Sequence, residues 1–167
     1  MSEDLIQQIS GRFDVEEVVS KANNNPKIFK FYAQHLIENT TTSWRAAWVI
    51  NHSTWKNDNR IAPYISGIIN SIEGKRDGHQ RELLKIVAKQ PLSEDQEGEF
   101  FDVCMNLWQD VNKQPAVRYY CMLFIHKTSN KYPEIENELE HLLGDYYLKT
   151  LSSGIKRSLF KKIGIDK

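Results

Sequence analysis

Apolar residues recur at helical spacing along almost the whole chain. The clearest case lies between Pro115 and Leu143, where two apolar stripes follow one another: Val117, Cys121, Phe124 and Ile125, then Ile135, Leu139, Leu142 and Leu143. Steps of three and four residues place each stripe on one face of a helix. A proline precedes each stripe, at a position where the missing N–H of a first helical turn costs nothing. Neither helix can bury its stripe alone, so the pattern predicts paired helices.

The same spacing predicts ten helices, and no segment alternates in the manner of a strand. Their expected ranges are 3–9, 13–23, 26–38, 42–55, 62–74, 78–89, 94–111, 115–129, 133–148 and 154–163. Local signals support several starts: Asn25 before Pro26 is an N-cap, and Ser93 with Gln96 forms a capping box. Asp77 is the expected cap of the helix that carries Arg81. The chain is therefore predicted to be all-α.

An internal repeat organises these helices. Arg45, Arg81 and Arg118 are 36 and 37 residues apart, each early in a predicted helix, and Arg157 follows. The partner helices repeat more regularly, since Ile65, Phe100 and Ile135 are spaced by 35, as are Ile69, Cys104 and Leu139. A period of this size in helix pairs predicts stacked helical hairpins. We expect one domain over residues 1–167, a right-handed superhelix of four to five pairs with the terminal pairs as caps.

Two motifs in this repeat resemble a known family. Pro115-Ala116-Val117-Arg118, followed by an apolar helix and then by Tyr132-Pro133-Glu134-Ile135 with Leu139 and Leu142, resembles a HEAT repeat of the armadillo-like superfamily. The resemblance covers about residues 40–145 and extends weakly to both ends. It implies the fold described above, and it implies interaction with other proteins more than any one chemistry.

The sequence departs from the family pattern at two repeated positions. The aspartate that often precedes the arginine by about six residues is replaced by Asn39, Lys75 and Asn112. The small residue usual three places after the arginine is Trp48, Leu84 or Cys121. These departures predict irregular geometry between the repeats.

Composition narrows the class of protein without assigning a chemistry. The 167 residues carry no net charge, which gives no general attraction to nucleic acid or anionic membranes. No run approaches the roughly 20 apolar residues of a membrane-spanning helix, and the acidic N-terminus is unlike a signal peptide. The two cysteines, Cys104 and Cys121, lie within apolar stripes. Buried free thiols are favoured over a disulfide, which suits a reducing cytoplasm.

Three tryptophans are candidate ligand-binding residues. Trp44, Trp48 and Trp55 lie at i, i+4 and i+11 of one predicted helix, near Asn51 and His52. They could form an aromatic cleft that stacks a base or another ligand. Packing between adjacent hairpins is the alternative and the favoured interpretation, because tryptophan carries a large apolar area. Trp55, beside the polar stretch 56–58, is the one expected to be exposed.

A second function class comes from DNA alkylpurine glycosylases, one class of which uses a helical-repeat fold with a basic concave surface. The candidate basic patch here is Lys75, Arg76, Arg81, Lys85 and Lys89. Acidic residues interrupt it, and residues 93–148 carry four Lys or Arg against eleven Asp or Glu. A groove that follows phosphates needs several cations on one surface, so a solvated helix face is favoured.

We expect no enzyme activity, no cofactor and no metal site, because no HExxH, P-loop, dinucleotide-binding or nucleophile-elbow motif occurs. The favoured function is an interaction module or adapter that binds a protein partner through its concave face, as a monomer or weak homodimer in the cytoplasm. The partner helices usually line that face. The predicted partner-binding residues are the polar positions beside their stripes: Asn70, Ser71, Asp102, Asn106, Asn137, Glu140 and His141. We expect a negative surface toward the C-terminal half, which suits a basic protein segment.

Overall fold

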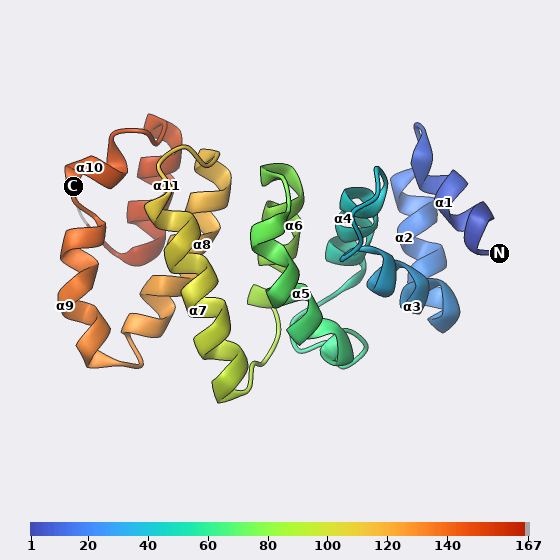
Figure 1. Cartoon of the computed structure of the whole chain (residues 1–167), viewed down its shortest axis with the longest axis horizontal. Helices are drawn as coiled ribbons and strands as arrows, with labels where there is room; N and C mark the ends of the chain where they lie inside the picture. Colours follow the sequence, from blue (N-terminus) through green and yellow to red (C-terminus); the bar gives the residue numbers. More distant parts are fainter. Residues whose placement is uncertain (166–167) are drawn as a thin grey trace. The chain divides into compact units, whose positions relative to one another are not determined.

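A computed structural model describes residues 1–165 of the chain. The chain divides into two compact units, Met1–Gln96 and a second unit that begins at Glu97, and each is described by itself. Residues 1–165 form helices and no strand, so the all-α prediction is confirmed (Figure 1). The handedness of the predicted superhelix and the prediction of one domain stay predictions.

The first unit consists of short helices. They are α1 (Ser2–Ser10), α2 (Val15–Asn24), α3 (Pro26–His35), α4 (Ser43–Ser53), η1 (Ala62–Tyr64), α5 (Ile65–Ser71), η2 (Ile72–Gly74) and α6 (Asp77–Ala88). Longer loops join α3 to α4 and α4 to η1 (Figure 1). Helices α2, α3 and α4 pack on one another, α4 also packs on α6, and α6 packs on α5. The α4 residues Ala46, Ala47 and Ile50 are fully buried, so α4 lies at the centre of this unit.

The second unit contains the two longest helices, α7 (Glu94–Gln109) and α8 (Pro115–Ser129). The first residues of α7 belong to the first unit. The other helices of the second unit are α9 (Pro133–Leu142), α10 (Asp145–Leu148) and α11 (Ser153–Ile163). Helix α8 packs on both α9 and α11 (Figure 1). Its stripe residues Val117, Cys121 and Ile125 are fully buried, as the periodicity predicted.

Local signals predicted most helix starts correctly. The Asn25 side chain accepts from the Lys27 N–H and Pro26 opens α3. Ser93 and Gln96 make both bonds of a capping box, because each side chain accepts from the other residue's N–H. The cap predicted for α6 was wrong by one residue, since Asp77 is its first residue and Arg76 is the N-cap.

Several predicted helices were too long or are divided. The helix predicted over 26–38 ends at His35, and the one predicted over 62–74 consists of η1, α5 and η2. Helix α4 ends at Ser53 because Thr54 is extended, while the Thr54 hydroxyl donates to the Ile50 carbonyl. The helix predicted over 133–148 is two helices, α9 and α10, separated at Gly144. A side chain at Gly144 would place its Cβ 3.0 Å from the His141 carbonyl oxygen, so a glycine suits the break between them.

The apolar stripes are buried unequally. Phe100 is buried and its ring centroid lies 4.4 Å from that of Phe124. In α9 only the end of the stripe is buried, at Leu142, whereas Ile135 and Leu139 are half-buried. Leu139, a residue of the predicted stripe, is therefore less buried than Phe100.

Arg118 joins the carboxyl ends of two helices in the second unit. It is fully buried, and its guanidinium donates to the carbonyls of Trp108 and Tyr147 and to the Thr150 hydroxyl, at 2.7–2.9 Å. The guanidinium also lies over the Trp108 ring, 4.5 Å from its centroid. These bonds give Arg118 a structural role, because they satisfy carbonyls that a helix end leaves without an internal donor.

The other repeated arginines do not share one role. Arg45 resembles Arg118, since it donates to the Ile9 carbonyl at 2.7 Å and to the Gly11 carbonyl at the end of α1. Arg81 instead forms an ion pair with the neighbouring Glu82, and Arg157 is exposed. Equivalent positions in the repeat therefore need not make equivalent contacts.

Candidate functional site

The predicted partner-binding residues lie on helix surfaces in both units. In the first unit, Asn70 is exposed on α5 and Ser71 is half-buried, with its hydroxyl donating to the Ile68 carbonyl. The remaining five are exposed on two helices: Asp102 and Asn106 on α7, and Asn137, Glu140 and His141 on α9. We call these five residues the α7–α9 row.

Two contacts fix how α7 and α9 run beside each other. Near the start of both helices, the Tyr132 hydroxyl donates to the Glu97 carboxylate at 3.0 Å. Near their ends, the Trp108 indole N–H donates to the Leu142 carbonyl at 3.0 Å. The two helices are therefore parallel, with a register close to 35 residues. Asp102 then corresponds to Asn137 and Asn106 to His141, so the row lies on equivalent outward faces.

This pair of helices is acidic. Helix α7 contains five Asp or Glu and α9 contains four, and neither contains a Lys or Arg. One of these carboxylates has a cationic partner, since Lys131 donates to Glu97 at 2.7 Å and lowers the pKa of that carboxyl. Asp102 and Glu140 are exposed within the row. The row therefore carries negative charge and no compensating cation from its own helices.

Of the three candidate tryptophans, Trp44 and Trp55 are exposed and Trp48 is half-buried, so the favoured core-packing interpretation was wrong for Trp44. Trp44 is 45 % exposed and Trp55 is 57 % exposed, and the expected exposure of Trp55 is confirmed. Trp48 is half-buried and stacks on His52, with ring centroids 3.9 Å apart. The buried tryptophan is Trp108, in the second unit.

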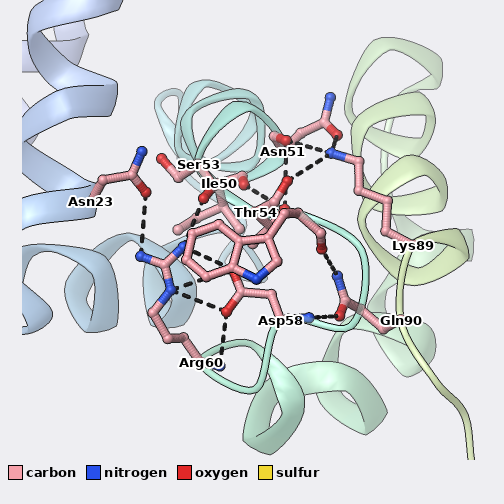
Figure 2. Close-up of polar contacts among 10 residues, drawn as sticks. Asn23, Ile50, Asn51, Ser53, Thr54, Asp58, Arg60, Lys89 and Gln90 are labelled. Carbon is pink, nitrogen blue, oxygen red and sulfur yellow. Dashed lines mark hydrogen bonds and ion pairs between the residues drawn. The ribbon is translucent and has the colours of Figure 1, made fainter.

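The Trp55 ring lies against the Arg60 guanidinium, whose bonds to Asn23, Ser53 and Asp58 are drawn in Figure 2. The Arg60 guanidinium lies 4.1 Å from the centroid of the Trp55 ring and 4.3 Å from that of Phe29. Arg60 also pairs with the buried Asp58 at 2.7 Å and donates to the Ser53 carbonyl at 2.7 Å. These bonds lower the pKa of Asp58 against the effect of its burial. An exposed indole with a fixed orientation is suited to contact a partner.

The loop that carries Trp55 is tied to the end of α6 (Figure 2). The Gln90 amide donates to the Trp55 carbonyl at 2.9 Å and accepts from the Asp58 N–H at 2.8 Å. Lys89 donates to the carbonyl and side-chain oxygens of Asn51, at 2.5 and 2.7 Å, at the carboxyl end of α4. Burial lowers the pKa of Lys89. Its ammonium is thus bound to this helix end, as expected for a cation at the negative end of a helix dipole.

Lys75 binds backbone carbonyls after the end of α3, as Lys89 does at the end of α4. Its ammonium donates to the carbonyls of Ile37 and Glu38 and to the Asn39 side chain, at 2.5–2.9 Å. Desolvation lowers its pKa. With Lys75 and Lys89 bonded to carbonyl oxygens and Arg81 and Lys85 beside Glu82, four of the five residues of the candidate basic patch have partners within the protein.

A cavity of about 620 Å³ opens beside Lys75. It is lined by the turn after α3, by Trp44, and by the segment that leads into α6: Glu38, Asn39, Thr40, Thr41, Trp44, Gly74, Lys75, Arg76, Gly78 and His79. Trp44 also lines a smaller cavity of about 290 Å³, next to Phe13 and Trp48. No motif in the sequence indicates the larger cavity, because its walls come from segments far apart in the chain.

The two cysteines lie in the core of the second unit. Cys104 and Cys121 are buried free thiols in contact, and burial with this contact raises the pKa of Cys104. A raised pKa disfavours the thiolate, so Cys104 is unsuited to act as a nucleophile. Within residues 1–165, no three His, Cys, Asp or Glu side chains are grouped to hold a metal ion. No helix in that range is long and apolar enough to cross a membrane.

Comparison with known proteins agrees with the stacked helical pairs. A family model described as a HEAT repeat domain matches residues 1–163. The chain belongs to the HEAT repeat domain family. The comparisons with curated proteins and with solved structures found no match. HEAT repeat proteins often serve as interaction scaffolds, and they are generally not catalysts.

Proposed function

We propose that this HEAT repeat protein is a non-catalytic interaction module or adapter that binds a basic segment of a protein partner along the α7–α9 row. The observation that carries the proposal is the parallel register of α7 and α9, which aligns exposed Asp102 and Glu140 on two helices without any Lys or Arg. A surface of one sign attracts a segment of the opposite sign and sets its orientation. It repels the phosphate backbone of nucleic acids.

The α7–α9 row has corresponding sequence positions in the first unit. Ser71 lies 35 residues before Asn106 in the sequence, so α5 offers Asn70 and Ser71 as the equivalent polar positions of its own repeat. We propose that they contribute to partner binding in the same manner. We also propose that the protein acts as a monomer or weak homodimer. We propose a cytoplasmic location, because the adjacent free thiols Cys104 and Cys121 suit a reducing compartment.

The test compares charge reversal on the row with charge reversal elsewhere. The full chain, an Asp102→Lys/Glu140→Lys variant and a matched Glu3→Lys/Glu16→Lys variant are titrated with a fluorescent Lys/Arg-rich peptide at low salt. Glu3 and Glu16 are exposed on α1 and α2, so the control changes the net charge equally. We expect the row variant to lose at least about tenfold more affinity than the control, about 1.4 kcal/mol.

A pull-down with the same three proteins extends the test to natural partners. Partners retained equally by the parent and the row variant would show that the row is not the binding surface.

The alternative function is that of a glycosylase-like DNA-binding protein, and the exposed indoles Trp44 and Trp55 are the observation in its favour. Against it, Lys75 and Lys89 of the candidate basic patch are bound to carbonyl oxygens. A DNA duplex titrated under the same conditions separates the two functions. Tight binding of the duplex by the parent would replace the adapter proposal with the DNA-binding one.

A further inference from the structure

The cavity beside Lys75 contains a buried side chain with an unused hydrogen-bonding atom. His79 is 7 % exposed, and its Nε2 bonds to the Leu36 carbonyl at 2.7 Å. Because a carbonyl can only accept, Nε2 carries the proton and Nδ1 is an acceptor. Among residues 1–165 no donor reaches this Nδ1, and His79 is one of the residues that line the cavity. A ligand in the cavity that offers an N–H or O–H would satisfy it.

The same cavity is also lined by a hydrogen-bond donor that could bind an anion, the guanidinium of Arg76. Arg76 is exposed, lines the cavity, and its guanidinium has no acid or carbonyl partner among the described residues. It is the N-cap of α6, a helix of 12 residues, and Gly78 in the first turn also lines the cavity. The first N–H groups of a helix lack internal acceptors and favour negative charge. A guanidinium beside such N–H groups is suited to a phosphate.

The third feature is an aromatic wall. Trp44 lines the cavity with about half of its side chain exposed, while Arg45 lies 5.1 Å from the centroid of its ring. Indole faces stack on nucleobases of any identity. The Glu38 carboxylate, held by His35 at 2.7 Å, lines the cavity as a further acceptor for hydroxyl or amino groups.

We propose that this cavity binds a nucleoside monophosphate, with the base on Trp44, the phosphate at Arg76 and the Gly78 N–H, and the hydroxyl or amino donors at His79 and Glu38. A ligand for this cavity must combine an aromatic ring, an anion and several donors, and nucleoside monophosphates carry all three. The volume of about 620 Å³ is in the usual range for cavities that bind small molecules. This site is independent of the α7–α9 row, since its residues belong to the first unit.

Calorimetric titration of the full chain tests the proposal, with AMP, adenosine and inorganic phosphate as separate probes. We expect saturable AMP binding with a Kd of about 1 mM or tighter. Adenosine and phosphate should each bind more weakly than AMP, because each offers only part of the required chemistry. AMP that binds no more tightly than inorganic phosphate would overturn the proposal.

Variants then assign the binding to the cavity. Trp44→Ala should weaken AMP binding about 5- to 150-fold, the range for loss of one stacked base. Arg76→Ala should weaken it about tenfold or more, through loss of a charge-assisted bond. Trp55→Ala and Lys56→Ala are the matched controls, because both side chains are exposed in the first unit and neither lines the cavity. Equal affinities in the cavity variants and the controls would overturn the assignment.

A single-stranded oligonucleotide distinguishes a mononucleotide site from part of a nucleic-acid surface. We expect it to bind no more tightly than AMP. If it binds more tightly and the binding depends on Trp44 and Arg76, the cavity belongs to a nucleic-acid groove and the mononucleotide proposal is wrong.

Discussion

The two units satisfy the carboxyl ends of their helices in different ways. In the first unit, four separate cations bind carbonyls at helix ends: Arg45 at α1, Lys75 after α3, and both Lys89 and Arg60 at α4. In the second unit, the fully buried Arg118 binds the end of α7 and the carbonyl of Tyr147, and the Trp108 indole binds the end of α9. Both arrangements supply hydrogen-bond donors to the last carbonyls of a helix, which have no donor within the helix.

The difference follows from the shape of the two cationic groups. A lysine ammonium is compact, so the donors of Lys75 converge on the neighbouring oxygens of one turn. The guanidinium of Arg118 is a planar fork that reaches two chain segments at once. Several partly solvated cations thus bind helix ends in the first unit, whereas in the second unit one fully buried guanidinium connects two chain segments.

The largest expected effect is therefore that of Arg118. Arg118→Ala should lower the free energy of unfolding by about 3–5 kcal/mol, because it leaves buried carbonyls without donors and removes a buried side chain. Urea unfolding measures the change. Arg157→Ala, at the exposed position of the same sequence repeat, is the control and should change it by less than about 0.5 kcal/mol. Equal effects of the two variants would contradict the comparison.

The next effect is a pH dependence located in the first unit. Burial lowers the pKa of His79 from 6.5 to about 4, with a further lowering by the charge of Lys75. The unfolded chain therefore binds a proton before the folded chain does, so stability falls as the pH decreases from about 6.5 to about 4. The loss approaches about 3 kcal/mol at the acid end of this window.

The pH dependence is measured by thermal or urea unfolding of the parent and of His79→Gln, whose amide can still donate to the Leu36 carbonyl. The variant should lose less stability than the parent between pH 6.5 and pH 4. Identical profiles would show that another group dominates the titration.

The smallest expected effect is that of one of the helix-end cations of the first unit. Lys89→Met keeps most of the apolar stem and removes the ammonium from Asn51 and Thr54. We expect a loss of about 1–2 kcal/mol in urea unfolding, below that of Arg118→Ala, because water can replace part of the contact. A loss as large as that of Arg118→Ala would remove the distinction between the units.

Patterns within the sequence were enough to predict most of the helices and their arrangement in pairs. Periodicity and capping depend on residues a few positions apart, which is why the starts at Pro26, Ser93 and Pro115 and the buried stripe of α8 were predicted. The repeat of 35 residues also carried spatial information, because the α7 and α9 contacts have that spacing. The break at Gly144 was missed because its cause is a close approach within one turn that leaves no change in the apolar pattern.

The roles of the polar and aromatic side chains follow from the tertiary structure and could not be predicted from the sequence. Lys75 and Arg76 are neighbours in the sequence, yet one is buried on the carbonyls at the end of α3 and the other is exposed at a cavity. The exposure of Trp44 depends on the segments 38–41 and 74–79, which lie far from each other in the sequence. Long side chains reach acceptors on other helices, so their partners follow from how the helices pack and not from local spacing.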